Sequence, residues 1–492
     1  MKPKYTLIAA AVLVGLAAYT FMFERGEKPK EGQLLRYGVE DATHIELTRG
    51  EETIVMDKQG DDWVLTQPAT GVAAADAVKR ILENVARFAP KATRSGEDLA
   101  AEAYGLEKPV VVAKVTFGST TVELSIGAEA VSGEFYAKLS DDSRLFTVPA
   151  SVKSDFEKKA DDLRERDVAK FDMKDISEVS LVRADQTIRL VNKPEKPAEG
   201  NTPPPSNWRI VEPVEAKADN SLVDTLARTI SNLRVDQFVD DAPPGGDEEM
   251  GLSAPRLTAA VKLKNGKEIS VAFGAEIEKP KDDTTTPKPP ETGTSTPPTT
   301  PEKQLYVRRA GRAETYLVKA TVLKDVDKAL SDLRNKQLVD VTVSDVTSFS
   351  LQRREGASFT GSKTGDKWQV SAGGAETIEA DTMNAENLLY DVKDLRAASF
   401  VDDVDPAESG LDAPAITIEL KVKGGGQPVR VLVGNKKGSQ YYARVGDDPQ
   451  VMLVDATKID GLHDALDDFK KSETKPAGDE GMLGDDVPTT SE

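Results

Sequence analysis

The stretch Asp61–Pro68 reads DDWVLTQP and contains one of the three tryptophans of this chain. Two similar stretches contain the others: Ser206–Pro213 reads SNWRIVEP, and Asp366–Gly373 reads DKWQVSAG. The tryptophans in equivalent places are Trp63, Trp208 and Trp368. Self-similarity of this kind indicates tandem copies of one unit.

Further landmarks follow each tryptophan in the same order. An Ala-Asp pair opens a helical pattern, a Gly-Leu-x-x-Pro turn follows, an apolar strand ends in glycine, and the next strand carries a tyrosine with a basic residue two positions later. The members are Ala75-Asp76, Ala218-Asp219 and Ala380-Asp381; Gly105, Gly251 and Gly410; Gly127, Gly274 and Gly434; and Tyr136, Tyr306 and Tyr442 with Lys138, Arg308 and Arg444. The segments Leu163–Asp175 and Leu333–Asp345 also align without a gap. This many landmarks in one order predict a triplicated domain.

Length and composition limit the classes of protein that fit. The 492 residues are too many for one core and sufficient for three domains of roughly 130 residues each. The formal net charge is −20, and Lys and Arg form no cluster, which argues against nucleic acid and anionic lipid as partners. The chain has no cysteine, so it has neither a disulfide nor a lipoprotein attachment site.

The N-terminal region carries one membrane signal. Tyr5–Phe23 contains no charged residue and is about as long as a helix that spans a bilayer core. Lys2 and Lys4 precede it, so the positive-inside bias predicts a cytoplasmic N-terminus and a periplasmic bulk at a bacterial inner membrane. A cleaved signal peptide is the alternative, but the run is long for one and Thr20–Phe23 is a poor cleavage neighbourhood.

The landmarks also predict the domain organisation. A cytoplasmic stub precedes the transmembrane anchor, a charged spacer follows it, and an acidic tail that we expect to be disordered follows the repeats. The Pro-rich and Thr-rich insertions in the second repeat are expected to be solvated hairpin loops. The ranges are 1–4 for the stub, 5–23 for the anchor, 24–38 for the spacer, 39–172, 173–342 and 343–470 for the repeats, 193–206 and 278–303 for the insertions, and 471–492 for the tail.

Within each repeat, the order strand, strand, helix and several strands predicts an α+β fold. Its sheet should be mostly antiparallel because hairpins dominate. Asp76 is expected to cap the first helix, and a polar helix over Ser151–Arg166 to close the first repeat. Each helix should cover one sheet face with an apolar stripe, and each tryptophan should pack near it. The stripes are Val78, Ile81, Leu82, Val85 and Phe88; Leu222, Leu226, Ile230 and Leu233; and Leu388, Leu389, Val392 and Leu395.

Residues that carry chemistry are scarce. Of the two histidines, His44 stands where the other repeats have other polar residues and is expected on an exposed strand, and His463 is expected in the last helix without a partner. No Cys/His zinc spacing occurs. Gly424–Gly426 follows a strand and indicates a hairpin turn rather than a phosphate-binding loop. The sequence therefore predicts neither catalytic residues nor a cofactor, and the chain is not expected to be an enzyme.

Two acidic pairs and the tyrosine strands leave alternatives open. Asp240-Asp241 and Asp402-Asp403 could hold calcium, but no calcium-loop spacing is present, so solvated acidic loops are the favoured interpretation. A hydrolase that uses paired carboxylates is less favoured still. The three tyrosines could form a binding strip for an envelope polymer such as a glycan, or could belong to a cross-strand packing pattern. The binding strip requires their rings to lie on one open face.

The landmarks resemble the bacterial domain-of-unknown-function family DUF4340, in three copies over nearly the whole region after the anchor. The best match is Tyr104–Pro109, YGLEKP, together with Leu163–Arg166, LRER. The third copy departs at Gly373, which replaces the proline after the tryptophan, and Met250 and Ser409 replace the tyrosine of the turn. Genes of this family often neighbour ABC exporter subunits of the gliding-motility type, including a large extracytoplasmic auxiliary protein. The resemblance therefore implies an accessory of such an exporter, and it supplies no catalytic residue.

These observations predict a membrane-anchored periplasmic scaffold without catalytic activity. Its expected partners are envelope proteins, such as an ABC exporter permease and its auxiliary subunit. Triplication favours this function because repeats more often build extended binding surfaces than single catalytic constellations. The alternative is a module that binds envelope glycan.

Overall fold

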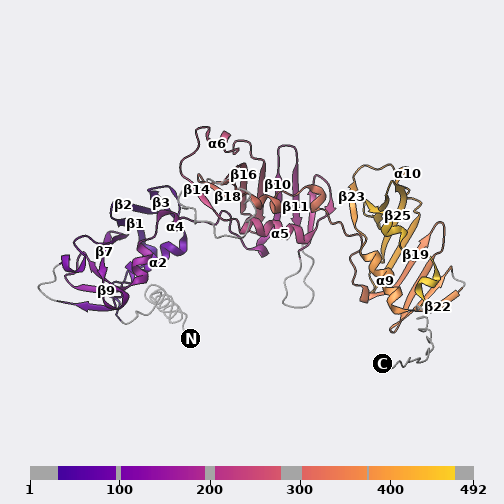
Figure 1. The fold of residues 1–492 in the computed structure, drawn as a ribbon, viewed down its shortest axis with the longest axis horizontal. Coiled ribbons are helices and arrows are strands. Elements are labelled where there is room, and N and C mark those ends of the chain that lie inside the picture. The colour runs from indigo at the N-terminus through magenta and orange to yellow at the C-terminus, as the bar shows by residue number, and fades with distance from the viewer. Residues whose placement is uncertain (1–31, 96–100, 194–205, 279–301, 374–375, 471–492) are drawn as a thin grey trace, which may run out of the picture. The chain divides into compact units, whose positions relative to one another are not determined.

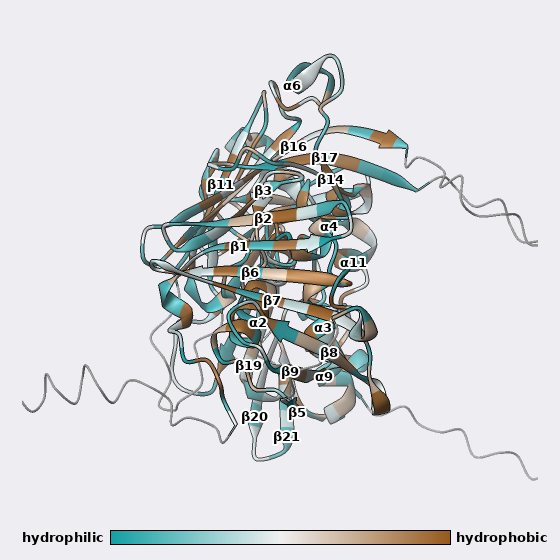
Figure 2. Cartoon of the chain, turned by 90° about the vertical axis from the view of Figure 1, so that its left-hand side faces the viewer, coloured by the Kyte–Doolittle hydropathy of each residue, from teal (hydrophilic) through white to brown (hydrophobic). Residues whose placement is uncertain are grey.

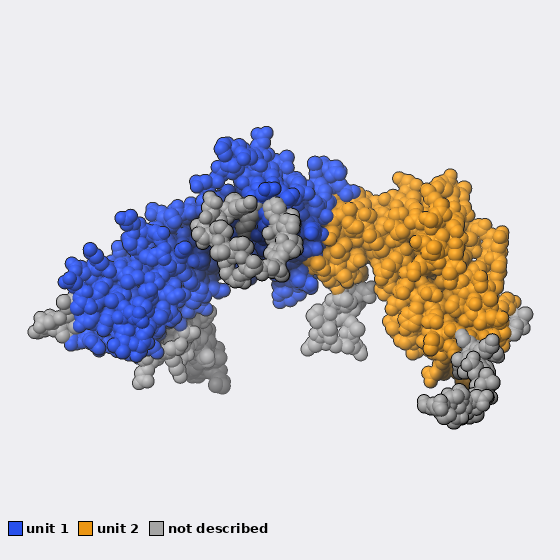
Figure 3. All heavy atoms as spheres, in the orientation of Figure 1, with its two compact units in different colours: residues 1–186, 226–327 blue, residues 187–225, 328–492 orange. Residues whose placement is uncertain are grey.

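A computed structural model describes residues 32–95, 101–193, 206–278, 302–373 and 376–470. The chain divides into two compact units, residues 1–186 with 226–327 and residues 187–225 with 328–492, which Figure 3 distinguishes by colour. The expected anchor and acidic tail lie outside the described residues. Among the described helices, none combines the length and apolar character needed to cross a membrane.

Three nine-stranded sheets of the same topology follow one another along the chain. The first has the order β4-β3-β2-β1-β6-β7-β8-β9-β5, and each pair of neighbouring strands in it is antiparallel. Its strands are β1 Ala42–Arg49, β2 Glu52–Gln59, β3 Asp62–Gln67, β4 Gly71–Val72, β5 Ala92–Arg94, β6 Val111–Phe117, β7 Thr120–Glu129, β8 Glu134–Leu139 and β9 Leu145–Pro149. Figure 2 shows β2, β1, β6 and β7 side by side, with polar and apolar segments in turn along them.

The second and third sheets repeat this order, β13-β12-β11-β10-β15-β16-β17-β18-β14 and β22-β21-β20-β19-β24-β25-β26-β27-β23. The second sheet contains β10 Ile176–Val182, β11 Thr187–Asn192, β12 Trp208–Glu212, β13 Ala216–Lys217, β14 Gln237–Val239, β15 Leu257–Leu263, β16 Glu268–Glu278, β17 Lys303–Arg309 and β18 Thr315–Lys319. The third contains β19 Val346–Arg353, β20 Phe359–Thr364, β21 Lys367–Ala372, β22 Glu376–Ala380, β23 Ala397–Val401, β24 Ile416–Val422, β25 Val429–Lys437, β26 Gln440–Val445 and β27 Val451–Asp455. Three such sheets with helices confirm the predicted α+β class and its antiparallel character.

Each repeat has one long helix and several short ones, which Figure 1 labels in part. The α-helices are α2 Ala75–Ala86, α3 Ala150–Phe156 and α4 Ala160–Leu163; α5 Asn220–Ser231, α6 Gly246–Glu249, α7 Leu323–Val326 and α8 Leu330–Leu333; and α9 Thr382–Lys393, α10 Pro406–Ser409 and α11 Ala456–Asp460. Short 3-10 turns occur at Val39–Asp41, Ala101–Tyr104, Val131–Gly133, Met173–Asp175, Ala320–Val322, Val343–Asp345 and Leu466–Phe469.

The apolar stripes of the long helices face the sheets. All expected stripe residues of α2 and α9 are buried, and they join core clusters with inward-facing strand residues such as Ile45 and Leu420. In α5 the expected Leu222 is only half-buried, and Val223 is buried beside Leu226 and Ile230. The long helices therefore pack as the 3.6-residue period predicts, with one position misassigned.

Several sequence-based boundaries were wrong. The expected helix over Ser151–Arg166 is two short helices, α3 and α4, because the charged residues between them offer no apolar stripe to hold a longer helix on the sheet. Ala74, not Asp76, is the N-cap of α2, and no side-chain hydrogen bond caps that helix. His463 lies between α11 and the final 3-10 turn rather than in a helix.

The alignment of the first helix was shifted by two residues. The backbone N–H groups of Ala74, Asp219 and Asp381 each donate to a carbonyl in the last turn of their own repeat, at 2.7, 2.8 and 2.8 Å. Ala73-Ala74 is therefore the true counterpart of Ala218-Asp219 and Ala380-Asp381. The alanine run from Ala73 to Ala75 made this register ambiguous in the sequence.

Both insertions emerge from hairpins. Lys193 N donates to Asn207 O at 2.9 Å between β11 and β12, and Glu278 lies opposite Lys303 between β16 and β17. The end residues Glu278 and Lys303 thus belong to paired strands. Residues 194–205 and 279–301 lie outside the described part of the chain.

Candidate functional site

The three landmark tryptophans are framework residues. Trp208 and Trp368 are buried, and Trp63 is half-buried against the core of the first repeat. Trp208 Nε1 donates to Asp224 Oδ1 on α5 at 2.8 Å, which confirms packing beside the helix for this tryptophan. The Trp368 ring lies 5.5 Å from Phe349 in the core of the third repeat.

In each repeat, the backbones of the two landmark glycines lie in close contact, which explains why both positions are glycine. Gly105, Gly251 and Gly410 have φ of 68°, 65° and 64°, a left-handed conformation that side chains rarely adopt. Each turn glycine lies against the second landmark glycine of its repeat, which is on the strand. A Cβ added to that strand glycine would overlap the carbonyl oxygen of the residue before the turn glycine. The strands were expected to end at Gly127, Gly274 and Gly434, but β7, β16 and β25 continue past these glycines, which lie at register shifts within them. The Gly-Leu-x-x-Pro motif therefore docks its turn onto a β-bulge.

The landmark tyrosines do not form an open strip. Tyr442 is 1% exposed and belongs to a small apolar cluster with Leu411 and Leu453, on the face of the third sheet opposite the main core. Tyr136 and Tyr306 are half-buried, and the Tyr136 ring meets Tyr104 edge-to-face at 4.8 Å. These contacts support the packing interpretation and not the three exposed rings that a polymer-binding strip requires.

In the second and third repeats, polar contacts hold the turn over the tyrosine strand. Tyr442 donates its hydroxyl to Glu408 Oε1 at 2.5 Å, and Lys437 pairs with the same carboxylate at 3.0 Å. The Tyr442 hydrogen bond, followed by that of Lys437, lowers the pKa of Glu408. In the second repeat, Arg308 forms a two-armed ion pair with Asp247, at 2.6 and 2.7 Å, whose hydrogen bonds lower the pKa of that carboxyl. The basic landmark residue Arg308 is thus a turn anchor rather than a solvated cation.

The first acidic pair belongs to a junction between repeats. Arg164, at the end of α4, has a side chain that is 2% exposed, and its Nη1 lies 2.8 Å from Asp240 Oδ1. The same guanidinium donates to Thr70 O at 3.0 Å and stacks 3.9 Å from the centre of the Phe238 ring. These residues belong to the same compact unit. One arginine therefore joins a loop of the first repeat to the strand β14 of the second.

The second acidic pair lies in an equivalent junction in the other unit. Arg334, at the end of α8, has a 4% exposed side chain, pairs with Asp402, and lies 5.0 Å from the Phe400 ring. We call Arg164 and Arg334 the junction arginines. Asp240 and Asp402 are exposed, as expected for solvated acidic loops, and each also forms an ion pair with a buried arginine.

The backbone between repeats hydrogen-bonds to both neighbours. After the first repeat, Glu165 N donates to Val72 O at 2.8 Å, and Val168 N donates to Leu233 O at 2.9 Å. The second linker repeats the pattern, because Asn335 N donates to Lys217 O at 2.9 Å and Leu338 N donates to Leu395 O at 3.2 Å. The linkers are thus short strand-like connections rather than free tethers.

Sequence reasoning missed these arginines although it had quoted their motif. The Leu-Arg pair occurs at positions 163–164 and 333–334, and Phe-Val-Asp-Asp occurs at 238–241 and 400–403. The first repeat has Thr93-Arg94-Ser95 in place of Phe-Val-Asp, and the third has Phe469-Lys470 in place of Leu-Arg. Each motif thus occurs only in repeats where it faces a neighbouring repeat. This distribution was the signal in the sequence that could have identified the junction arginines.

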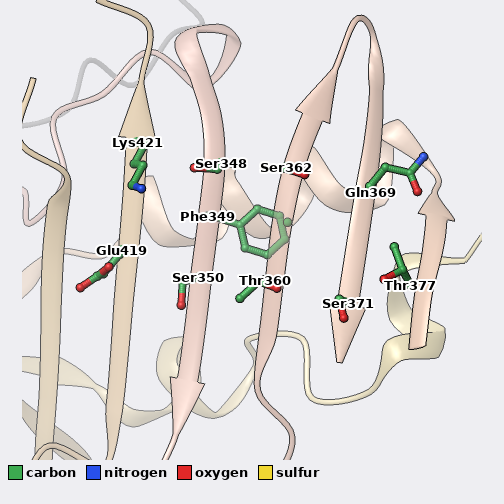
Figure 4. A pocket seen from close by; sticks show the side chains of 11 residues that line it. Ser348, Phe349, Ser350, Thr360, Ser362, Gln369, Ser371, Thr377, Glu419 and Lys421 are labelled. Carbon is green, nitrogen blue, oxygen red and sulfur yellow. The ribbon is translucent and has the colours of Figure 1, made fainter. Parts of the chain in front are cut away.

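The outer faces of the sheets differ in chemistry. On the first sheet, charged side chains pair with one another: His44 Nδ1 lies 2.7 Å from Asp57, and Lys114 lies 3.6 Å from Glu46 and 3.7 Å from Glu123. The corresponding face of the third sheet is lined by short hydroxyl side chains around a shallow cavity of about 390 Å³, shown in Figure 4. The framework is therefore repeated while the exposed faces are not.

The two histidines, which were the remaining candidate residues, have ordinary polar or aromatic neighbours. His44 is a partly exposed residue of β1, and the His463 ring packs 4.8 Å from Phe469. Within the described ranges, no three His, Cys, Asp or Glu side chains are grouped so that they could hold a metal ion.

A family model described as a domain of unknown function (DUF4340) matches residues 63–206 and 208–414. The match covers more than half of the chain, so this protein belongs to the DUF4340 family, with tandem copies of the domain. No curated protein matches the chain significantly.

Two solved sliding clamps align with the chain at low similarity. The beta clamp of Helicobacter pylori has 7% identity over 87% of this chain and 94% of that chain, with a TM-score of 0.14. The DnaN sliding clamp (DNA polymerase III subunit beta) of Pseudomonas aeruginosa has 8% identity over 87% and 93%, with a TM-score of 0.12. TM-scores this low support no inference about fold or function.

Proposed function

We propose that this protein is a non-catalytic scaffold, anchored in a bacterial inner membrane through residues 5–23, whose three repeats bind other envelope proteins. The partners that fit the proposal are components of an ABC-type export complex, such as a permease and its large extracytoplasmic auxiliary subunit. The export association comes from the family resemblance, and the anchor comes from the apolar N-terminal run.

One observation carries the scaffold proposal. The repeated landmark residues, namely the tryptophans, the paired glycines, the tyrosines and the junction arginines, are used in packing and in joining repeats. What is repeated is therefore a framework, whereas the exposed sheet faces vary. Repeat proteins that bind partners combine a constant framework with variable surfaces in this way.

The glycan-binding alternative loses its original basis. It required the rings of Tyr136, Tyr306 and Tyr442 on one open face, and Tyr442 is 1% exposed beneath the turn that contains Glu408. Protein binding therefore remains the better-supported general function.

Co-purification tests this proposal. The full chain, carrying a C-terminal tag, is extracted from membranes in mild detergent and compared with a variant whose residues 5–23 are replaced by a cleavable signal peptide. We expect export-complex subunits to co-purify with the anchored chain in fixed proportion. An anchored chain that purifies alone, or that fractionates with the cytoplasm, would refute the proposal.

A further inference from the structure

The open half of the third sheet has an unusual composition. Neighbouring strands β19, β20, β21 and β22 present short hydroxyl side chains outward, and β24 beside them presents charged ones. They are Ser348, Ser350, Thr360, Ser362, Ser371 and Thr377. Figure 4 shows Glu419 and Lys421 at one side of this face and Gln369 and Thr377 at the other. We call this surface the hydroxyl face.

The hydroxyl face surrounds a cavity rather than a flat surface. Its volume of about 390 Å³ falls within the range of roughly 300–1,000 Å³ that small-molecule sites occupy. The other half of the same sheet face is covered, because the segment that contains Leu411 packs on Tyr442 and Leu453. The cavity therefore lies beside a wall built by the repeat itself.

One hydroxyl in this cavity lacks a partner. Ser350 Oγ, on β19, is shielded from solvent and makes no hydrogen bond to any described residue. A buried polar group without a partner is unfavourable, and such groups are rare in folded proteins. Ser350 lines the cavity, but its Oγ has no surface open to a ligand, so the hydroxyls that a ligand can contact are those of exposed residues such as Thr360 and Ser362.

The charges around the cavity narrow the class of ligand. Among the described residues that line it, Glu419 is the only acid and Lys421 the only base, and Arg430 Nε already donates to Glu419 at 2.7 Å. A phosphate or carboxylate ligand would find a single free cation, and a cationic ligand would find an engaged carboxylate. Serine, threonine and glutamine side chains both donate and accept hydrogen bonds, as sugar hydroxyls do.

The matching face of the first sheet supports this specificity. Its outward side chains His44, Asp57, Lys114 and Glu46 satisfy one another in ion pairs, so they offer few free donors or acceptors. The hydroxyl face of the third repeat thus differs in chemistry from the matching face of the first.

We propose that the hydroxyl face binds a neutral oligosaccharide. The hydroxyls of Thr360 and Ser362 and the amide of Gln369 hydrogen-bond the sugar hydroxyls across the strands. This site does not depend on the scaffold proposal, and it differs from the tyrosine strip expected from the sequence.

Binding to short neutral oligosaccharides tests the site directly. The full chain in detergent micelles is titrated with chitotetraose and maltotetraose and applied to an array of neutral and anionic oligosaccharides. The variants are Thr360→Ala and Ser362→Ala, and Thr116→Ala on the first sheet is the matched control. Each hydroxyl removed from the cavity should weaken binding roughly two- to tenfold, as expected for one lost hydrogen bond. Thr116→Ala should bind as the wild type does.

Stability measurements keep the test interpretable. Thr360 and Ser362 are exposed, so alanine at either position should leave the melting temperature close to that of the wild type. Binding that falls without loss of stability supports the site. The proposal is overturned if no neutral oligosaccharide binds, if only anionic ones bind, or if both alanine variants bind as well as the wild type.

Discussion

The junction between the first two repeats provides the sharpest prediction. Asp240→Asn removes the charge that faces Arg164 while keeping the side-chain shape. Breaking a fully buried ion pair costs about 3–5 kcal/mol because one charge remains unpaired. The Arg164 side chain is 2% exposed but that of Asp240 is 44% exposed, so solvent screens part of the interaction. We expect a loss of about 1–2 kcal/mol in the free energy of opening this junction.

Trypsin reports that opening, because Arg164 and Arg166 lie in the linker itself. A loss of about 1–2 kcal/mol should increase the open population, and hence the rate of cleavage at the linker, roughly 5- to 30-fold. Asp402→Asn should accelerate cleavage at the second linker in the same way, since Arg334 is 4% exposed. Cleavage fragments resolved by mass spectrometry assign each event to its linker.

Asp241→Asn is the matched control, because it removes the same charge from the adjacent exposed residue. It should leave the cleavage rate close to that of the wild type. Equal rates for Asp240→Asn, Asp241→Asn and the wild type would refute the claim that the ion pair holds the junction.

Three further predictions concern the framework. Gly434→Ala should lower the melting temperature strongly, because the added Cβ would overlap the docked turn. Gly426→Ala is the control and should be neutral, because its Cβ would meet nothing within 4 Å. Equal effects of the two substitutions would contradict the docking of the turn. Burial raises the pKa of Tyr316 from 10.0 to about 12, so its contribution to stability is present below pH 10 and is lost as pH rises towards 12. Tyr316→Phe should abolish this loss in melting curves recorded at alkaline pH. The same alkaline loss in Tyr316→Phe as in the wild type would refute the prediction. Trp63→Phe should remove most acrylamide quenching of tryptophan fluorescence, since Trp368 is fully buried; strong residual quenching would contradict the burial.

The sequence was sufficient for the order of elements because repetition and hydrophobic period are local signals. Three copies of one pattern predicted three similar antiparallel sheets, and the stripes of α2 and α9 identified the buried helix faces. Boundaries failed where local signals were weak. The alanine run before Asp76 hid the start of α2, and the charged stretch after Phe156 resembled one helix.

The junctions and the hydroxyl face could not be predicted from local pattern. The partner of Arg164 is Asp240, far along the chain, and only the fold brings them together. An exposed acidic pair that is only solvated and one that also binds a buried arginine have the same sequence signature. Similarly, Ser350 and Ser362 alternate with core residues as any outward-facing strand residues do, and only the packed sheet shows that they border one cavity.

Site-specific photocrosslinking in intact cells tests the scaffold proposal most directly. A photoreactive residue is placed at the exposed apolar positions Val131, Val182 and Met383, one in each repeat, whose exposures are 83%, 41% and 71%. The proposal predicts that at least one position captures an export-complex subunit, identified by mass spectrometry, and that capture disappears when residues 5–23 are removed. Capture of no envelope protein at any of the three positions, in cells that express the export complex, would contradict it.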